Sequence, residues 1–247
     1  MRILVANDDG ISSEGVKALA EVLSKDNEII VVAPDGNRSG FSHSLTIGRE
    51  LFFKEVKISD KFKAFSLSGT PADCVKFATH KFSDFKFDLV CSGINHGNNL
   101  GSDTAYSGTV AAGLEANYLG LPAIAFSNIA QNGWMFDETA KIVDKLFKKL
   151  VELSSTEYTV NVNIPNLRCE EIKGVKFAHL GVQKYSDYYE QTSGGGYVLK
   201  GEMLTDGVHP ECDVALSVTG YVTVTPISFN RTDFATIKKF EGTELKL

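Results

Sequence analysis

The sequence has few cysteines, and they are not arranged as a site. Cys74, Cys91, Cys169 and Cys212 are scattered without C-x-x-C spacing, and the first two fall inside apolar segments. This pattern favours reduced, buried thiols over disulfide bonds or a zinc site. We therefore expect neither a disulfide nor zinc.

Long hydrophobic runs are also missing. No apolar stretch reaches the roughly 18 residues that a membrane-spanning helix needs, and the first residues follow a strand pattern in place of a basic segment before a long apolar one. A secretory leader is therefore not indicated. We expect a cytoplasmic protein without a membrane partner.

Basic residues are outnumbered by acidic ones, 25 against 31, which gives a net charge of −6. A partner that exposes a phosphate backbone favours a concentrated basic surface, so polymeric nucleic acid is not an expected partner. What the sequence does have is apolar material, since 43% of its 247 residues are hydrophobic. That share suffices for a large core.

Strand and helix patterns alternate along the first part of the chain. Strand-like runs fall at 3–6, 29–33, 89–92 and 122–127, and helical periods at 15–24, 71–80, 109–119 and 135–151. This alternation predicts an α/β fold with a Rossmann-like three-layer core, in which helices cover a mostly parallel sheet. Two further runs, 51–58 and 63–67, have a short connection that suits an antiparallel pair.

After residue 158 the pattern becomes β-rich, with helix signals nearly absent. Runs at 159–164, 175–180, 197–204 and 221–226 resemble strands, and the glycines at 194–196 lie between groups of tyrosines. We predict a catalytic core at 1–157 and a β-rich C-terminal elaboration at 158–247 with a protruding hairpin. Its tyrosines either form an interface or fold back on the domain.

The first strand ends in two adjacent acids, Asp8 and Asp9, followed by Gly10. In open α/β sheets, ligands bind outside the carboxyl ends of the strands, and paired carboxylates there suggest a metal site. Three alternatives remain open at this point: a hairpin turn, solvated loop charges, or a cap of the next helix. The helical period after Ser13 argues against the hairpin.

The connections after the other strands are rich in small polar residues. Arg38 and Ser39 follow the second strand, and a guanidinium among hydroxyls suits a phosphate or carboxylate. Asn95 and Asn99 lie in a long connection without strand or helix pattern, where they offer oxygen ligands or orient a substrate. Oxygen ligands alone favour Mg²⁺ or Mn²⁺ over zinc.

Two helix starts at the same predicted edge provide anion sites. Thr70, Pro71 and Asp73 have the spacing of a capping box, and Ser107-Gly108-Thr109 opens the helix after the asparagine connection. Small residues, free backbone amides and a helix dipole are what a phosphate needs. A hard cation beside an anion-binding turn indicates phosphate chemistry.

Five motifs in this order resemble the SurE family of survival proteins, which are metal-dependent nucleoside monophosphate phosphatases. The motifs are NDDG (7–10), APD (33–35) with NRSG (37–40), SGTPADCV (68–75), SGIN (92–95) with Gly97 and NLG (99–101), and SGTV (107–110). The resemblance spans essentially the whole chain. It implies a Rossmann-like core, a β-rich arm, and a C-terminal segment exchanged between the subunits of a homodimer or homotetramer.

The resemblance also implies a site. One divalent cation per subunit would be held by Asp8, Asp9, Ser39 and Asn95, with Asp8 and Asp9 as the catalytic residues, and the phosphate would contact Ser107, Gly108 and Thr109. The implied activity is hydrolysis of nucleoside 5′-monophosphates, with 3′-monophosphates as a second candidate class. The roles of His43 and His96 stay open.

Other classes of protein fit less well. A phosphorylatable receiver module would need a phosphoacceptor Asp after a central strand, where this chain has Ser92-Gly93-Ile94-Asn95. A phosphatase of the aspartyl-phosphate type would need acids in D-x-D spacing, whereas here they are adjacent. A non-catalytic module that binds a nucleotide or a metal remains the alternative.

Overall fold

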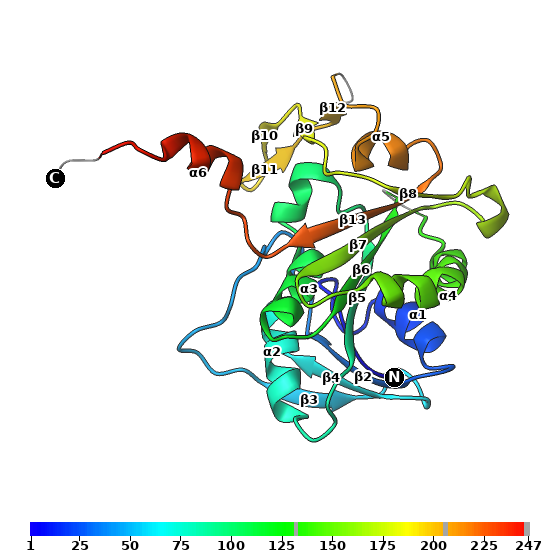
Figure 1. The fold of residues 1–247 in the computed structure, drawn as a ribbon. Coiled ribbons are helices and arrows are strands. Elements are labelled where there is room, and N and C mark those ends of the chain that lie inside the picture. Colours follow the sequence, from blue (N-terminus) through cyan, green and yellow to red (C-terminus); the bar gives the residue numbers. More distant parts are fainter. Residues whose placement is uncertain (131–132, 205–206, 245–247) are drawn as a thin grey trace.

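The computed structural model describes residues 1–130, 133–204 and 207–244. Its centre is a nine-stranded sheet (Figure 1) in the order β3-β4-β2-β1-β5-β6-β7-β13-β8. The strands are β1 (Arg2–Ala6), β2 (Glu28–Pro34), β3 (Phe53–Val56), β4 (Lys63–Leu67), β5 (Leu89–His96), β6 (Ala123–Ile129), β7 (Tyr158–Pro165), β8 (Val175–Phe177) and β13 (Val222–Ser228). Only β3 with β4 and β7 with β13 pair antiparallel within this sheet. The predicted Rossmann-like α/β class and the mostly parallel sheet are confirmed.

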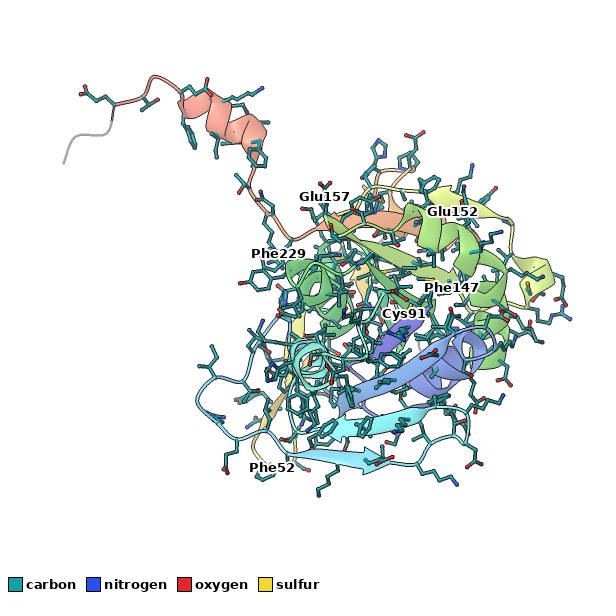
Figure 2. The ribbon with its side chains drawn as sticks, turned by 60° about the horizontal axis from the view of Figure 1, so that its bottom comes forward. Phe52, Cys91, Phe147, Glu152, Glu157 and Phe229 are labelled. Atoms are coloured by element: carbon teal, nitrogen blue, oxygen red, sulfur yellow. The ribbon has the colours of Figure 1, made fainter. Side chains whose placement is uncertain are left out.

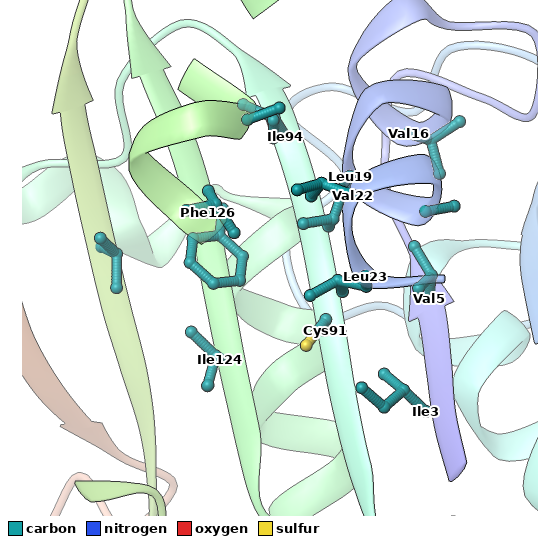
Figure 3. Close-up of a cluster of buried hydrophobic side chains, with 14 of the residues drawn as sticks. Ile3, Val5, Val16, Leu19, Val22, Leu23, Cys91, Ile94, Ile124 and Phe126 are labelled. Carbon is teal, nitrogen blue, oxygen red and sulfur yellow. The ribbon is translucent and has the colours of Figure 1, made fainter. Parts of the chain in front are cut away.

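Four helices cover the two faces of the sheet. They are α1 (Glu14–Leu23), α2 (Pro71–Lys81), α3 (Gly108–Tyr118) and α4 (Phe136–Leu153). Because neighbouring strand residues point to opposite faces, Ile3 and Val5 join the core under α1 and α4, whereas Leu4 and Ala6 join the core under α2 and α3. Figure 3 shows the first of these cores, with Leu19 and Leu23 of α1 beside Phe126 of β6.

Capping side chains fix where three of the helices begin. Ser13 Oγ accepts a hydrogen bond from the Val16 backbone N–H and starts α1. Thr70 and Asp73 form the predicted capping box of α2, with proline at the first position. Ser107 Oγ accepts from the Val110 N–H at 3.0 Å and starts α3. All three starts lie just past the strand ends, so they place helix N-termini at the carboxyl edge of the sheet.

The long connection after β5 is more regular than predicted. β5 continues to His96, with its register against β6 shifted between Ser92 and Asn95, and a 3-10 helix spans Gly101–Ala105. The expectation of no strand or helix pattern there was wrong. The reason is local: Gly93 has a φ of +122°, a conformation that favours glycine, and the resulting irregularity interrupts the alternation that marks a strand.

The C-terminal part contains the predicted protruding hairpin. β10 (Tyr188–Gln191) pairs with β11 (Tyr197–Lys200), and their side chains are exposed. A second small pair joins β9 (Lys184–Tyr185) to β12 (Met203–Leu204), so the predicted single strand at 197–204 is two. Two short helices, α5 (Asp213–Ser217) and α6 (Phe234–Phe240), were also missed. They are too short for a helical period to stand out.

The predicted division at residues 157 and 158 stays a proposal. β7, β13 and β8 continue the nine-stranded sheet beyond that point, while the hairpin and α6 extend outside it (Figure 1). The last three residues of the predicted oligomerising tail, 245–247, lie outside the described part of the chain. None of the described helices has the length and hydropathy to span a bilayer.

Candidate active site

A tight turn carries the two acids out of β1. The side chain of Asn7 closes this turn, because its amide nitrogen donates to Gly10 O at 3.0 Å and to Ser13 Oγ at 2.8 Å. Gly10 has a φ of +101°, and a Cβ there would lie 3.0 Å from the backbone of Gly36. The turn therefore needs glycine at this position. Since Ser13 caps α1, the alternative that Asp9 is its cap is ruled out.

Asp8 is almost completely buried, with 3% of its surface exposed. The Thr109 hydroxyl donates to Asp8 Oδ1 at 2.5 Å. Burial, and after it the negative charge of Asp9, raise the pKa of Asp8 to about 6, although hydrogen bonds from Thr109 oppose the change. Removal from water disfavours the charged form of a carboxyl. Asp8 thus sits where a compensating positive charge would stabilise it.

The N-terminus of α3 packs directly on Asp8. A Cβ added to Gly108 would lie 2.7 Å from Asp8 Cβ, 2.9 Å from Pro71 Cγ and 3.0 Å from Asp8 Oδ2. Real Cβ atoms do not approach so closely, so only glycine fits. The positive end of the α3 dipole is thereby held against the buried acid. Ser107, Gly108 and Thr109, the predicted phosphate contacts, all lie at this point.

Asp9 is held by His96, whose role the sequence left open. His96 Nδ1 lies 3.0 Å from Asp9 Oδ1, and the His96 backbone N–H donates to Asp9 Oδ2 at 3.0 Å. Hydrogen bonding to Asp9 raises the pKa of His96, although partial burial opposes the change. Only 4% of the Asp9 side chain is exposed, which is consistent with an orienting role for the histidine.

The loop after β2, which carries Ser39, contacts the first acid through its backbone. The Arg38 N–H donates to the Asp8 carbonyl at 2.7 Å. Ser39, which is exposed, is the next residue in the chain. The Arg38 guanidinium instead donates to Asp35 Oδ1 at 2.6 Å and to the Asn37 carbonyl. In this structure the predicted phosphate-binding arginine is therefore engaged within its own loop.

Asn95 and Asn99 differ in their surroundings. The Asn95 amide nitrogen donates to the Gly97 carbonyl at 2.9 Å. The side-chain oxygen of Asn95 takes no part in this hydrogen bond. Asn95 directly precedes His96, the residue that contacts Asp9. The Asn99 amide nitrogen donates to Ser127 Oγ at 2.7 Å in the interior, and its role in orienting a substrate stays a prediction.

Two asparagines that the sequence analysis missed fix the Asn99 backbone. The side chains of Asn161 and Asn163 on β7 both donate to the Asn99 carbonyl, at 2.8 and 2.9 Å, and Asn163 Oδ1 accepts from the Asn99 N–H at 2.8 Å. Both side chains are fully buried. The sequence did contain a signal for them: two polar residues stand two positions apart in an otherwise apolar strand. Residues at that spacing share one face of the sheet, so they can contact the same group.

The donor chemistry of the site fits a hard divalent cation. Burial, and after it the charge of Asp9, raise the pKa of Asp8, and the predicted ligand set adds the Ser39 hydroxyl and the Asn95 amide oxygen. Within residues 1–130, 133–204 and 207–244, no three His, Cys, Asp or Glu side chains are grouped to hold a metal ion. The predicted set does not require such a group, since serine and asparagine supply two of its four oxygen ligands.

The fold and these contacts define an α/β protein with two buried acids and a helix N-terminus together at the carboxyl edge of a mostly parallel sheet. The family model described as "Survival protein SurE" matches residues 3–187. A 5′-nucleotidase SurE from Clostridium tetani is 43% identical over 240 residues, which cover 95% of this chain and 96% of that protein. The chain belongs to the SurE family.

Two comparisons with Aquifex aeolicus agree with this assignment. Its 5′-nucleotidase SurE is 41% identical over 249 residues, covering 98% of this chain and 97% of that protein. The crystal structure of a SurE protein from the same organism matches with a TM-score of 0.85 at 39% identity, and covers 97% of this chain and 98% of that one. The resemblance therefore extends from the motifs to the whole fold.

Proposed function

We propose that this chain is a metal-dependent phosphomonoesterase that hydrolyses nucleoside 5′-monophosphates to nucleoside and phosphate, with 3′-monophosphates as a second substrate class. The observation that carries the proposal is the packing of Gly108 and Thr109, at the positive end of α3, on the buried Asp8. A helix N-terminus suits a phosphate, and paired acids suit a cation that neutralises it. The relatives named 5′-nucleotidase support the substrate class.

In the proposed mechanism, each group of residues has one task. Asp8, Asp9, Ser39 and Asn95 hold one Mg²⁺ or Mn²⁺, and this cation supplies Lewis-acid stabilisation of the charge that develops on the phosphoryl group. Thr109 orients Asp8 through its hydroxyl, and His96 orients Asp9. The α3 N-terminus binds the phosphate oxygens and contributes electrostatic stabilisation without a covalent step.

An assay of phosphate release tests the proposed activity. We expect the protein to release phosphate from 5′-AMP with Mn²⁺ or Mg²⁺, and chelation by EDTA to lower the rate by at least about 10²-fold, because the cation carries most of the electrostatic stabilisation. The substrate panel should include 3′-AMP and the other common bases. No release from any of these substrates with either cation would favour the non-catalytic nucleotide-binding module instead.

We also propose that the protein acts in the cytoplasm as a homodimer or homotetramer. α6 extends away from the body of the molecule (Figure 1), and Phe234, Ile237 and Phe240, three residues apart on one side of it, are 62%, 49% and 63% exposed. An apolar stripe of this kind normally packs against another surface. A second copy of this chain is the partner that the family resemblance implies.

Sedimentation velocity tests this assembly. The intact protein should sediment as a dimer or a tetramer, and a variant with F234S, I237S and F240S should sediment as a smaller species, because the apolar stripe has been removed. A matched triple change on exposed lysines of α4, K145S, K148S and K149S, should leave the mass unchanged. An intact protein that sediments as a monomer would contradict the proposal.

A further inference from the structure

The loop between β2 and β3 carries Arg38 and Ser39, and a partly buried hydrogen bond joins its middle to α3. His43 Nε2 lies 2.8 Å from Glu115 Oε2. Glu115 belongs to the same helix as Gly108 and Thr109, and only 4% of its side chain is exposed. The pair thus joins the loop that holds one predicted cation ligand to the helix that meets the phosphate.

Both carboxylate oxygens of Glu115 have hydrogen-bond partners. Glu115 lies about two turns along α3 from Gly108, the residue that packs on Asp8. Its Oε1 accepts a hydrogen bond from Lys76 Nζ of α2 at 2.5 Å. Burial alone would raise the pKa of Glu115, but the hydrogen bonds from His43 and Lys76 outweigh it and lower that pKa. A buried carboxylate is costly without such partners. Lys76 and His43 thus both stabilise the Glu115 carboxylate, and of the two only His43 belongs to the loop.

The other anchors of this loop are mostly made by its backbone. The Ser42 N–H donates to the Tyr106 carbonyl at 3.0 Å, just before α3, and the Thr46 N–H donates to Asp73 Oδ1 at 3.0 Å, in the first turn of α2. His43 lies between these anchors, and its side chain reaches the buried middle of α3. The Thr70 hydroxyl also donates to the Ser44 carbonyl at 2.7 Å, so the His43 side chain adds a contact with the middle of α3 to the anchors on its two neighbours.

The His43–Glu115 pair lies beside an open pocket. A cavity of about 600 Å³ adjoins His43 and Glu115, and Leu45, Tyr118 and Arg231 are among its lining residues. Phe229 contacts the His43 ring edge-on, with the ring centroids 5.6 Å apart. Figure 2 labels Phe229 where β13 leads into the segment that carries α6. If the hydrogen bond to Glu115 were lost, this pocket would offer space for the His43 side chain.

We propose that His43 and Glu115 are positioning residues that hold the 39–46 loop against α3, so that Ser39 stays beside Asp8 when cation and substrate bind. This inference rests on the proposed function of the same site. A loop that samples other positions lowers the fraction of molecules competent to bind, and the apparent affinity falls by that fraction. Saturating cation and substrate restore the competent state, so the maximal rate is less affected.

The test compares H43A with H43Q, E115Q and H80A. We expect H43A to raise the KM for 5′-AMP and the Mn²⁺ concentration for half-maximal rate by about tenfold each, the worth of one hydrogen bond to a charged group, with kcat changed less than about twofold. H43Q should restore most of the loss, because its amide nitrogen can donate to Glu115 in place of Nε2. E115Q should act like H43A. H80A, at the exposed end of α2, should behave as wild type.

Hydrogen exchange gives a second readout that needs neither cation nor substrate. In the metal-free protein, H43A should speed amide exchange at residues 38–46 by about tenfold, while exchange in the core strands and the melting temperature stay close to wild type. Unchanged exchange of the loop together with unchanged KM in H43A and E115Q would overturn the inference. Equal loss in H43Q and H43A would overturn it as well. Inactivity of the wild type would instead contradict the proposed function, and the exchange experiment would still decide the loop contact.

Discussion

Asp8→Asn is expected to lower kcat/KM for 5′-AMP by about 10³-fold, the order of loss seen when one electrostatic partner is removed from a reacting centre. Asparagine keeps the shape of the side chain and can still accept the hydrogen bond from Thr109, so what changes is the charge. Steady-state phosphate release across a range of Mn²⁺ concentrations measures the effect. Activity close to that of wild type at any Mn²⁺ concentration would show that Asp8 does not act as proposed.

The same substitution should not weaken the metal-free fold. The pKa of Asp8 rises from 3.8 to about 6 in the folded state, so the ionised carboxyl opposes folding, and its cost grows as pH rises from about 4 to 6. Above pH 6, Asp8→Asn should therefore be more stable than wild type by up to about 2 to 3 kcal/mol. Below pH 4 the two proteins should be alike.

Urea unfolding of the chelated protein at several pH values measures this difference. D84N is the matched control, because Asp84 is exposed and lies before β5, at the other edge of the sheet. Its stability relative to wild type should hardly vary with pH. If D8N were less stable than wild type at pH 7, Asp8 would be favourably charged without a cation, and the need for a compensating positive charge would disappear.

Gly108→Ala has the second largest expected effect. The added methyl group must displace Asp8 or Pro71, which lie 2.7 and 2.9 Å from its position. Overpacking of this kind costs about 1–3 kcal/mol, and a displacement near 1 Å at a reacting group costs about 10²-fold in rate. We therefore expect both a lower free energy of unfolding and a kcat/KM reduced by about 10²-fold per folded molecule.

Gly113→Ala separates these two effects. Gly113 lies on the same helix, and its added Cβ would meet Thr159 Cγ2 at 2.5 Å in the core, away from the acids. G113A should lose a similar amount of stability and yet keep its activity once the folded fraction is taken into account. If G108A and G113A lost activity in the same proportion, the effect would come from general destabilisation, and the close fit of Gly108 on Asp8 would have no functional meaning.

Much of the fold could be predicted because its signals are local. Apolar runs of four to seven residues marked the buried strands, and the capping residues Ser107 and Thr70 marked helix starts to within a residue. The parallel orientation of most strands follows from the alternation of strand and helix along the chain. Where the backbone departs from a regular period, as at Gly93 in β5, or where a helix has only five or seven residues, the pattern contains too little information.

The candidate site could be predicted in part for a related reason. Asp8 and the start of α3 each follow an apolar segment, and the topology of parallel strands then brings them together. The hydrogen bond between His96 and Asp9, the inward direction of Asn99 and the burial of Glu115 depend on contacts between residues 28 to 87 positions apart. Such long-range contacts produce no periodic pattern of residues that a single sequence could show.

Equilibrium binding of Mn²⁺, followed by its electron paramagnetic resonance signal, tests the central claim most directly, because it detects the cation without turnover. The account predicts one tightly bound Mn²⁺ per chain in the wild type, loss of that binding in D8N and D9N, and wild-type binding in H80A. Tight binding that persists in both aspartate variants, or no tight binding in the wild type, would contradict a metal site at the end of β1.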